Sequence, residues 1–185
     1  SENILSKFNK FYQNLKIIKK SKFENKNIED TINKSLKKFK QIECFMLHSF
    51  DDFNNKELIN KLIQFKNENK IKKIGVSVYN VNEAIEILND INIDIIQIPF
   101  NYIDNQWFNT KFHNLLKEKK KEIHVRSIFL QGILLNDPLK YPNNISKKDF
   151  EDLQNKIIIV AEKLNISNLE LCFYFINSFN WINKI

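Results

Sequence analysis

Short apolar runs alternate with segments of helical periodicity, and this alternation limits the possible folds of the chain more than any other feature. Five runs rich in Ile, Val and Phe have the composition of buried β-strands. Their starts lie roughly 22 to 30 residues apart, close to the spacing in a barrel that builds eight strand–helix units from about 250 residues. We predict strands at Leu15–Lys20, Ile42–His48, Lys72–Val78, Asp94–Phe100 and Ile123–Phe129.

Helices are expected between and after these strands. Apolar residues fall three and four positions apart, as in Ile28, Ile32, Leu36 and Phe39, which is the spacing of one helix face. The predicted helices are Ile28–Phe39, Asn55–Asn67, Val81–Leu88, Asn109–Lys119, Lys147–Leu164 and Ser167–Phe179. Ser1–Tyr12 has the pattern of a further helix, and Trp181–Ile185 that of the start of another strand. We therefore expect an α/β fold and one domain over residues 1–185, a partial (β/α)8 TIM barrel missing roughly its first two strands and most of its last.

An open doubly wound sheet is the alternative architecture. Such a sheet normally holds a dinucleotide on a glycine-rich first turn. The chain has only Gly75 and Gly132, so neither a GxGxxG turn nor a P-loop can exist. This excludes a Rossmann nucleotide site and makes the open sheet less favoured than the barrel.

The formal net charge of +7 raises the question of a nucleic-acid partner. Lys and Arg are mixed with Asp and Glu along almost every predicted helix, and the densest run, Lys117–Glu122, closes a helix where positive charge suits the macrodipole. We expect a solvated surface there and no nucleic-acid partner.

Cysteine usage and hydropathy indicate the compartment. Cys44 and Cys172 form no CxxC spacing, no disulfide framework and no metal motif, which fits a reducing cytosol and predicts no metal site. No stretch reaches the ~18 uncharged apolar residues of a membrane helix, and the N-terminus lacks the layout of a signal peptide. The expectation is a cytoplasmic protein with no membrane partner.

Polar residues stand at the carboxyl ends of all five predicted strands. The strand-to-helix loops of a barrel meet at that rim, so these residues are the candidates for chemistry: Lys20, His48, Ser77, Gln97 and Arg126 with Ser127. A structural role competes with a functional one for Lys20, which lies among other lysines, for His48 and for Ser77. Gln97 and Arg126 interrupt strands that are otherwise apolar, where unmade hydrogen bonds would cost ~1–3 kcal/mol. His113 and His124 are assigned non-catalytic roles.

The ordered motifs around these residues resemble those of the aldo-keto reductase family. Each motif alone is weak, but their order and spacing cover nearly the whole chain. They are Lys-Ile-Ile-Lys-Lys-Ser at 16–21, Ser-Leu-Lys-Lys-Phe at 35–39, Phe-Met-Leu-His at 45–48, Lys-Ile-Lys-Lys-Ile-Gly-Val-Ser at 70–77, Asp-Ile-Ile-Gln-Ile-Pro-Phe-Asn at 94–101, and Val-Arg-Ser-Ile-Phe-Leu-Gln-Gly at 125–132.

The resemblance implies an oxidoreductase that reduces an aldehyde or ketone by hydride transfer from NADPH, less often NADH. In the family a Tyr donates the proton, supported by Lys, His and Asp. His48 matches the histidine that orients the carbonyl, and Lys20 matches the lysine that makes the tyrosine a stronger acid. Ser77 and Gln97 match side chains that hold the nicotinamide carboxamide.

Further positions are implied to touch the cofactor. Arg126 stands where many members stack an aromatic ring on the nicotinamide, and a planar guanidinium can also stack. Ser127, Phe129 and Gln131 fall in the loop that approaches the pyrophosphate. Val78 replaces an Asn that often follows the serine.

Part of the family site has no counterpart in this sequence. The first five residues, Ser-Glu-Asn-Ile-Leu, resemble the segment directly after the family's Tyr-Gly motif. The resemblance therefore implies that the Tyr and its Asp precede Ser1, and that this truncated sequence is inactive by itself.

Three functions remain open on sequence grounds. The leading one is a carbonyl reductase with a small-molecule carbonyl substrate. The others are a non-catalytic barrel that senses nucleotide or serves as an interaction subunit, and, more weakly, a nucleic-acid binder. The substrate and the oligomeric state do not follow from the sequence.

Overall fold

The computed structural model describes residues 2–11, 15–23, 27–39, 41–135 and 146–185. Contacts within the chain divide it into two compact units. The first comprises Ser1–Ile98 and Asn109–Glu122, and the second Pro99–Phe108 and Ile123–Ile185. A single domain over residues 1–185 stays a prediction.

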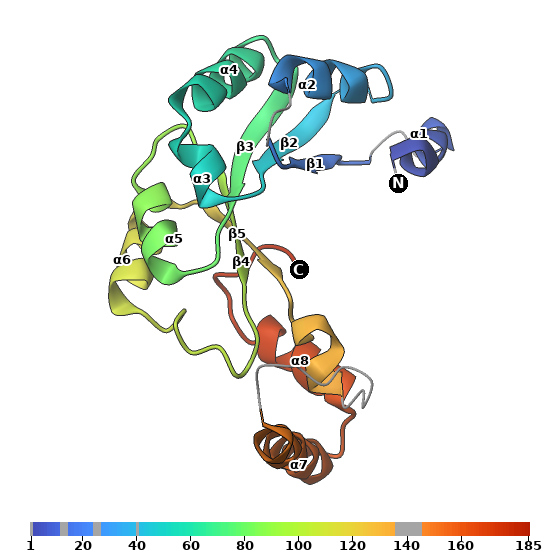
Figure 1. Cartoon of the computed structure of the whole chain (residues 1–185), viewed down its shortest axis with the longest axis vertical. Coiled ribbons are helices and arrows are strands. Elements are labelled where there is room, and N and C mark those ends of the chain that lie inside the picture. Colours follow the sequence, from blue (N-terminus) through green and yellow to red (C-terminus); the bar gives the residue numbers. More distant parts are fainter. Residues whose placement is uncertain (1, 12–14, 24–26, 40, 136–145) are drawn as a thin grey trace. The chain divides into compact units, whose positions relative to one another are not determined.

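The sheet has five strands in the order β1-β2-β3-β4-β5, which is their order along the chain (Figure 1). The strands are β1 (Ile18–Ser21), β2 (Ile42–Leu47), β3 (Ile71–Ser77), β4 (Ile95–Pro99) and β5 (Glu122–Arg126). Pairing is parallel between β1 and β2, β2 and β3, and β3 and β4. The prediction of an α/β fold with parallel neighbours in chain order is confirmed.

Helices follow the strands of the first unit, and asparagines begin four of them. Its helices are α1 (Glu2–Phe11), α2 (Ile28–Leu36), α3 (Phe50–Asn54), α4 (Lys56–Asn67), α5 (Val81–Leu88) and α6 (Thr110–Lys119). The side chains of Asn27, Asn55, Asn80 and Asn109 accept hydrogen bonds from backbone N–H groups in the first turns of α2, α4, α5 and α6. An N-cap of this kind satisfies a donor that the helix itself leaves unpaired.

The core of the first unit lies on both faces of its sheet. Burial is continuous through the second halves of β2 and β3, from Cys44 to Leu47 and from Ile74 to Ser77. Parallel strands covered on both faces read as unbroken apolar runs. Cys44, Met46 and Ile95 form one packed group on the face that also carries Gly75.

The second unit contains most of β5, the 3-10 helix η1 (Leu130–Leu135), α7 (Lys147–Leu164) and α8 (Asn168–Asn177). Phe100 is fully buried, and four rings surround it with centroids 5.3 to 5.9 Å away: Phe108, Phe175, Phe179 and Trp181. A second apolar group forms around Leu134, Ile157 and Cys172.

The chain end pairs with β5. His124 and Lys184 form a parallel bridge, the Val125 N–H donates to the Lys184 carbonyl at 2.8 Å, and the Ile123 N–H donates to the Asn183 side chain at 2.7 Å. This agrees with the expected start of a strand after α8.

Most predicted boundaries agree with the structure to within a few residues. The bounds of α5 and α7 match the prediction, whereas Ser1 and Tyr12 of the first predicted helix lie outside the described residues. His48, Val78 and Phe129 fall just after β2, β3 and β5 instead of inside them. The prediction missed two short helices, α3 and η1. β5 ends early because Ser127 has a φ of 62°, a left-handed conformation that breaks an extended strand.

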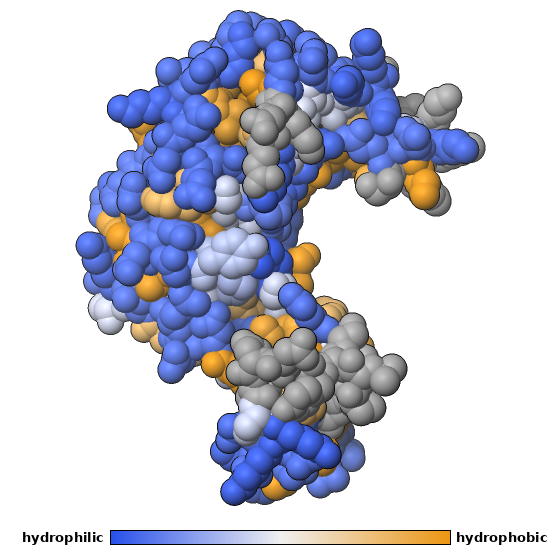
Figure 2. Space-filling model, in the orientation of Figure 1, coloured by the Kyte–Doolittle hydropathy of each residue, from blue (hydrophilic) through white to orange (hydrophobic). Residues whose placement is uncertain are grey.

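The surface shows the mixed polarity expected from the sequence. On the face of the first unit seen in Figure 2, hydrophilic side chains cover most of the helices and apolar ones appear as separate spots. In the described part of the chain, no helix is long and apolar enough to span a membrane.

Candidate active site

Three of the predicted site residues form one hydrogen-bonded group at the carboxyl ends of β1, β3 and β4. The Lys20 ammonium donates to Ser77 Oγ and to Gln97 Oε1, both at 2.8 Å. Ser77 Oγ also lies 3.3 Å from Gln97 Oε1, to which its hydroxyl donates. Side chains 57 and 77 residues apart in the sequence thus meet at one point.

Strand register explains why these side chains share one face. Lys20 is paired with Met46, Met46 with Gly75, and Gly75 with Ile95, so these four residues form one layer across the sheet. Side chains two residues apart on a strand point to the same face. Ser77 and Gln97, which pair with each other, therefore form the next layer on the face of Lys20.

The three residues differ in burial, and this decides what they can offer a ligand. Ser77 is fully buried, whereas Lys20 and Gln97 are half-buried. A half-buried ammonium has lost part of its hydration, and hydrogen bonds from an ionised donor are stronger than those between neutral groups. The group presents a cation and an amide side by side, with the buried Ser77 hydroxyl bonded to both, which suits a ligand bearing both a carbonyl oxygen and an N–H group.

His48 follows β2 directly and belongs to the same face. It stands two residues after Met46 and one after Leu47, which pairs with Val76, so alternation places it level with Ser77. His48 is half-buried. The predicted proximity of Lys20 and His48 is consistent with this placement and stays a prediction.

Arg126 and the loop after β5 belong to the second unit. The Arg126 guanidinium donates to Ser127 Oγ at 3.3 Å, and the backbone carbonyl of Arg126 accepts from the Phe100 N–H at 3.1 Å. The Ser127 carbonyl accepts from Asn101 Nδ2 at 3.4 Å. These bonds tie the end of β5 to the residues that follow β4.

The loop then turns through residues with left-handed backbone. Leu130, Gln131 and Gly132 all have positive φ, between 45° and 93°. The Phe129 ring packs edge-on against Phe173, with centroids 5.5 Å apart, while Gln131 is exposed. Phe129 is therefore fixed by packing, and Gln131 is open to solvent.

A family model described as the aldo/keto reductase family matches residues 3–178, nearly the whole chain. The chain belongs to this family. A search of proteins with curated descriptions found no significant match.

Solved aldo-keto reductases share the fold. A Klebsiella pneumoniae aldo/keto reductase in complex with NADP and acetate superposes with a TM-score of 0.73 at 13% identity, covering 100% of this chain and 64% of its own. An aldo-keto reductase from Bacillus halodurans in its holo form has a TM-score of 0.63 at 22% identity, with 83% and 58% covered. A glycerol dehydrogenase from Gluconobacter oxydans has a TM-score of 0.64 at 16% identity, with 85% and 53% covered.

These matches identify the fold as part of an aldo-keto reductase barrel. The sheet is not closed in the described part of the chain, and the chain spans 53% to 64% of the length of those three structures. The predicted (β/α)8 class and family are confirmed.

Two polar residues near the end of β4 were given no role by the sequence analysis. Asn101 is buried, donates to the Ser127 carbonyl, and accepts from the Ile103 N–H at 3.2 Å. Its position after an apolar strand was the available signal. Tyr102 lies half-buried, and burial raises the pKa of its phenol. A raised pKa makes Tyr102 a poor proton donor near neutrality.

Among the described residues, no group of three or more His, Cys, Asp or Glu side chains is arranged to hold a metal ion. The polar groups of the candidate site are an ammonium, an amide, a hydroxyl and an imidazole. This donor set suits an organic ligand with amide and carbonyl groups.

Proposed function

We propose that this aldo/keto reductase chain carries the cofactor and carbonyl sites of an enzyme that reduces an aldehyde or ketone to an alcohol. The observation that carries the proposal is the hydrogen-bonded group of Lys20, Ser77 and Gln97 at one end of a parallel sheet. NADPH, or less often NADH, supplies the hydride when bound.

Ser77 and Gln97 are proposed to hold the nicotinamide ring through its carboxamide. A carboxamide has one acceptor oxygen and an NH2 donor. If the Ser77 hydroxyl turns from Gln97 Oε1 to that oxygen, it donates there, and the lone pair that it leaves on Gln97 Oε1 can accept from the NH2 group. This pairing fixes which face of the nicotinamide is turned toward the substrate.

His48 and Lys20 are proposed to act on the substrate side. A neutral imidazole donates one hydrogen bond, which orients the carbonyl oxygen and stabilises negative charge that develops there. The Lys20 ammonium favours the ionised form of a neighbouring phenol and so makes that phenol a stronger acid. That phenol would then supply the proton of the product alcohol.

Arg126, Ser127, Phe129 and Gln131 are proposed to line the rest of the cofactor site. The planar Arg126 guanidinium can stack on a nicotinamide ring. Its positive charge favours the neutral reduced ring over the cationic oxidised ring. Ser127 and Gln131 lie in the loop proposed to approach the pyrophosphate.

The tyrosine donor and its aspartate are proposed to come from chain preceding Ser1, because the first five residues resemble the segment after the family's Tyr-Gly motif. Residues 1–185 alone should then bind NADPH weakly and reduce carbonyls negligibly. A protein extended at both ends should reduce some aldehyde, since general acid catalysis contributes typically ~10²–10⁴-fold.

The test separates cofactor affinity from chemistry in the extended protein. Gln97→Ala should weaken NADPH binding about tenfold, because a carboxamide hydrogen bond is lost. His48→Ala should lower turnover by about 10²-fold or more while changing NADPH affinity little. Fluorescence titration of NADPH and rates with a panel of aldehydes measure the two effects.

Gln64→Ala is the matched control, because Gln64 lies on the exposed face of α4 and its side chain bonds only locally, to Glu68, in the described structure. Unchanged turnover in His48→Ala, with wild type active on the same panel, would remove His48 from the site. Tight NADPH binding without turnover on any carbonyl would favour the nucleotide-sensing barrel.

A further inference from the structure

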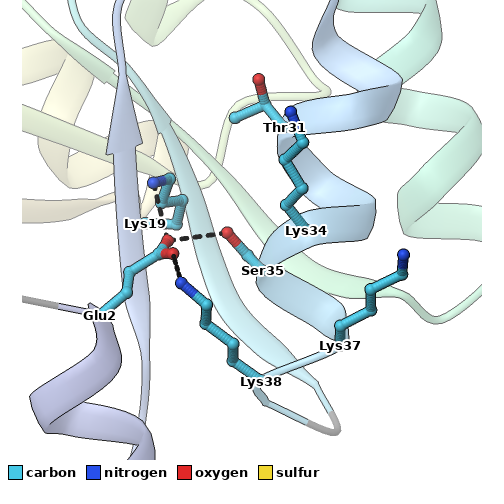
Figure 3. Close-up of a pocket in the computed structure, with 7 residues that line it drawn as sticks. All are labelled: Glu2, Lys19, Thr31, Lys34, Ser35, Lys37 and Lys38. Atoms are coloured by element: carbon cyan, nitrogen blue, oxygen red, sulfur yellow. Dashed lines mark hydrogen bonds and ion pairs between the residues drawn. The ribbon is translucent and has the colours of Figure 1, made fainter.

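A second polar cluster lies on the opposite face of β1. A pocket of about 370 Å³ is lined by residues of α1, β1 and α2 and by Lys37 and Lys38, which follow α2. Figure 3 shows these side chains. Three side chains point at the Glu2 carboxylate. Lys19 Nζ donates to Oε1 at 2.7 Å, Ser35 Oγ donates to Oε1 at 2.8 Å, and Lys38 Nζ donates to Oε2 at 3.1 Å. We call Glu2, Lys19, Ser35 and Lys38 the Glu2 clasp.

The Glu2 clasp is more enclosed than an ordinary surface ion pair. Ser35 is only 1% exposed, and the side chains of Glu2 and Lys19 are each 25% exposed. The Lys147–Glu151 pair on α7, by contrast, is 3.7 Å long with exposures of 82% and 60%. Exposed pairs of that kind contribute little to stability because water and salt screen them. The clasp instead joins a carboxylate to a buried hydroxyl and two partly buried cations.

Lys19 links this cluster to the candidate active site. Lys19 pairs in register with Phe45, and Lys20 with Met46. Consecutive residues of a strand point to opposite faces. Lys19 therefore reaches the Glu2 clasp from one face of β1, while Lys20 reaches Ser77 and Gln97 from the other face.

β1 depends on such anchors because it is short and lies at the edge of the sheet. It has four residues and pairs with β2, at one end of the strand order. A short edge strand has few ladder hydrogen bonds to fix its position along its neighbour. The hydrogen bond of Lys19 to Glu2 adds a side-chain contact at the residue next to Lys20.

We propose that Glu2 is a positioning residue for Lys20: through Lys19, its carboxylate holds β1 so that the Lys20 ammonium meets Ser77 and Gln97. The importance of this for catalysis rests on the proposed function. The placement of Lys20 itself is independent of the proposed function. It can be measured without cofactor or substrate.

The experiment uses competitive acetylation of residues 1–185, with the extent of labelling at each lysine read by mass spectrometry. In wild type the Lys20 ammonium is engaged and reacts slowly relative to exposed Lys163. In Glu2→Gln, relative labelling of Lys20 should rise about tenfold, as expected when a charge-assisted anchor is lost. Lys19→Met should act similarly and Lys38→Met less, since Lys38 is the more exposed partner.

Three further variants make the result specific. Glu29→Gln removes an equal charge from α2, where Glu29 pairs with Lys61 at 3.5 Å, and should leave Lys20 labelling unchanged. Glu2→Asp keeps the carboxylate and should restore part of the protection. Ser35→Ala removes one hydroxyl and supplies a milder test if Glu2→Gln does not fold.

The outcomes separate this proposal from the proposed function. If Glu2→Gln folds and Lys20 labelling equals that of wild type, the positioning role is wrong, whatever NADPH does. If Lys20 labelling rises but wild type binds no NADPH in the extended protein, Glu2 positions Lys20 and the proposed function fails. If Glu2→Gln shows both increased labelling of Lys20 and weaker NADPH binding than wild type, the positioning role and the proposed function are both supported.

Discussion

The carboxylate of Glu2 is bound by side chains distant in the sequence, and these partners change its pKa. The hydrogen bond from Lys19 is the main cause that lowers the pKa of Glu2 from 4.5 to about 2, with help from Ser35 and Lys38 and against partial burial. Lys34 and Lys37 line the same pocket, although Lys37 points away from the carboxylate in Figure 3. Glu2 therefore stays ionised at every pH at which the protein would be assayed.

Acid should remove the stability that Glu2 contributes. The folded pKa lies below the unfolded one, so this contribution is complete above about pH 4.5 and is lost as the pH falls toward about 2. At pH 7, Glu2→Gln should lower the free energy of unfolding by about 1 to 2 kcal/mol, because solvent screening at partly exposed groups reduces the full effect of the shift. Urea unfolding of wild type and Glu2→Gln between pH 7 and pH 3 measures the difference.

That difference should shrink at the acid end of the series, while Glu29→Gln should show a small and nearly constant difference. A Glu2→Gln effect that is the same at pH 7 and pH 3 would contradict the assignment.

Among the elements, the inner face of β2, β3 and β4 is packed around a residue without a side chain. A Cβ placed on Gly75 would lie 3.0 Å from Met46 Cε, 3.1 Å from Cys44 Sγ and 3.4 Å from Ile95 Cβ. Met46 and Cys44 fill the space that a side chain at residue 75 would need. Side chains of β2 therefore fill the layer next to Ser77 and Gln97, because β3 contributes no side chain at residue 75.

Larger residues at position 75 should destabilise the sheet in order of size. Gly75→Ala should cost about 1 kcal/mol, since the end of the Met46 side chain can shift, and Gly75→Val about 2 to 3 kcal/mol through overpacking. Chemical denaturation gives both values. In a Met46→Ala background the extra cost of Gly75→Ala should be smaller, because Met46 Cε is the nearest atom to the new Cβ, while Cys44 Sγ stays 3.1 Å from it. Additive effects in this double mutant would mean that the clash lies elsewhere.

At the scale of the whole molecule, the described sheet ends at β1, and an edge strand offers unpaired backbone groups to another chain. Leu15 and Ile18 near this edge are 42% and 39% exposed. Register places Ile18 on the same face as Cys44 and Met46, which are buried. An apolar residue on the core-facing side of an edge strand favours association with another apolar surface.

We expect residues 1–185 to self-associate as concentration rises, which light scattering coupled to size-exclusion chromatography would detect. Ile18→Lys should reduce this association by placing charge on the edge. Ile91→Lys is the control, because Ile91 is 90% exposed and lies in the turn before β4. A chain that stays monomeric at high concentration and unfolds in one cooperative step would exclude an open edge of this kind.

The family and fold class could be predicted from the sequence because their signals are local. Apolar residues spaced for strands and helices specify each element within a few turns of chain. The bounds of α5 and α7 agree with the prediction for this reason. The polar residues Lys20, Ser77 and Gln97 could be selected by their position at strand ends alone.

Their partners could be found only in the tertiary structure. The sequence pattern predicts a helix that includes Glu2, but not its bonds to Lys19, Ser35 and Lys38. These partners lie too far along the chain for a local pattern to reveal them. The sequence around Ser127 also did not predict the left-handed turn that ends β5, since Ser rarely adopts that conformation. The sequence determined which side chains stand at the ends of the strands, because that depends on neighbouring residues. Only the register between strands decided that Lys20 lies on the same face as Ser77 and Gln97, because register depends on packing between segments far apart in the chain.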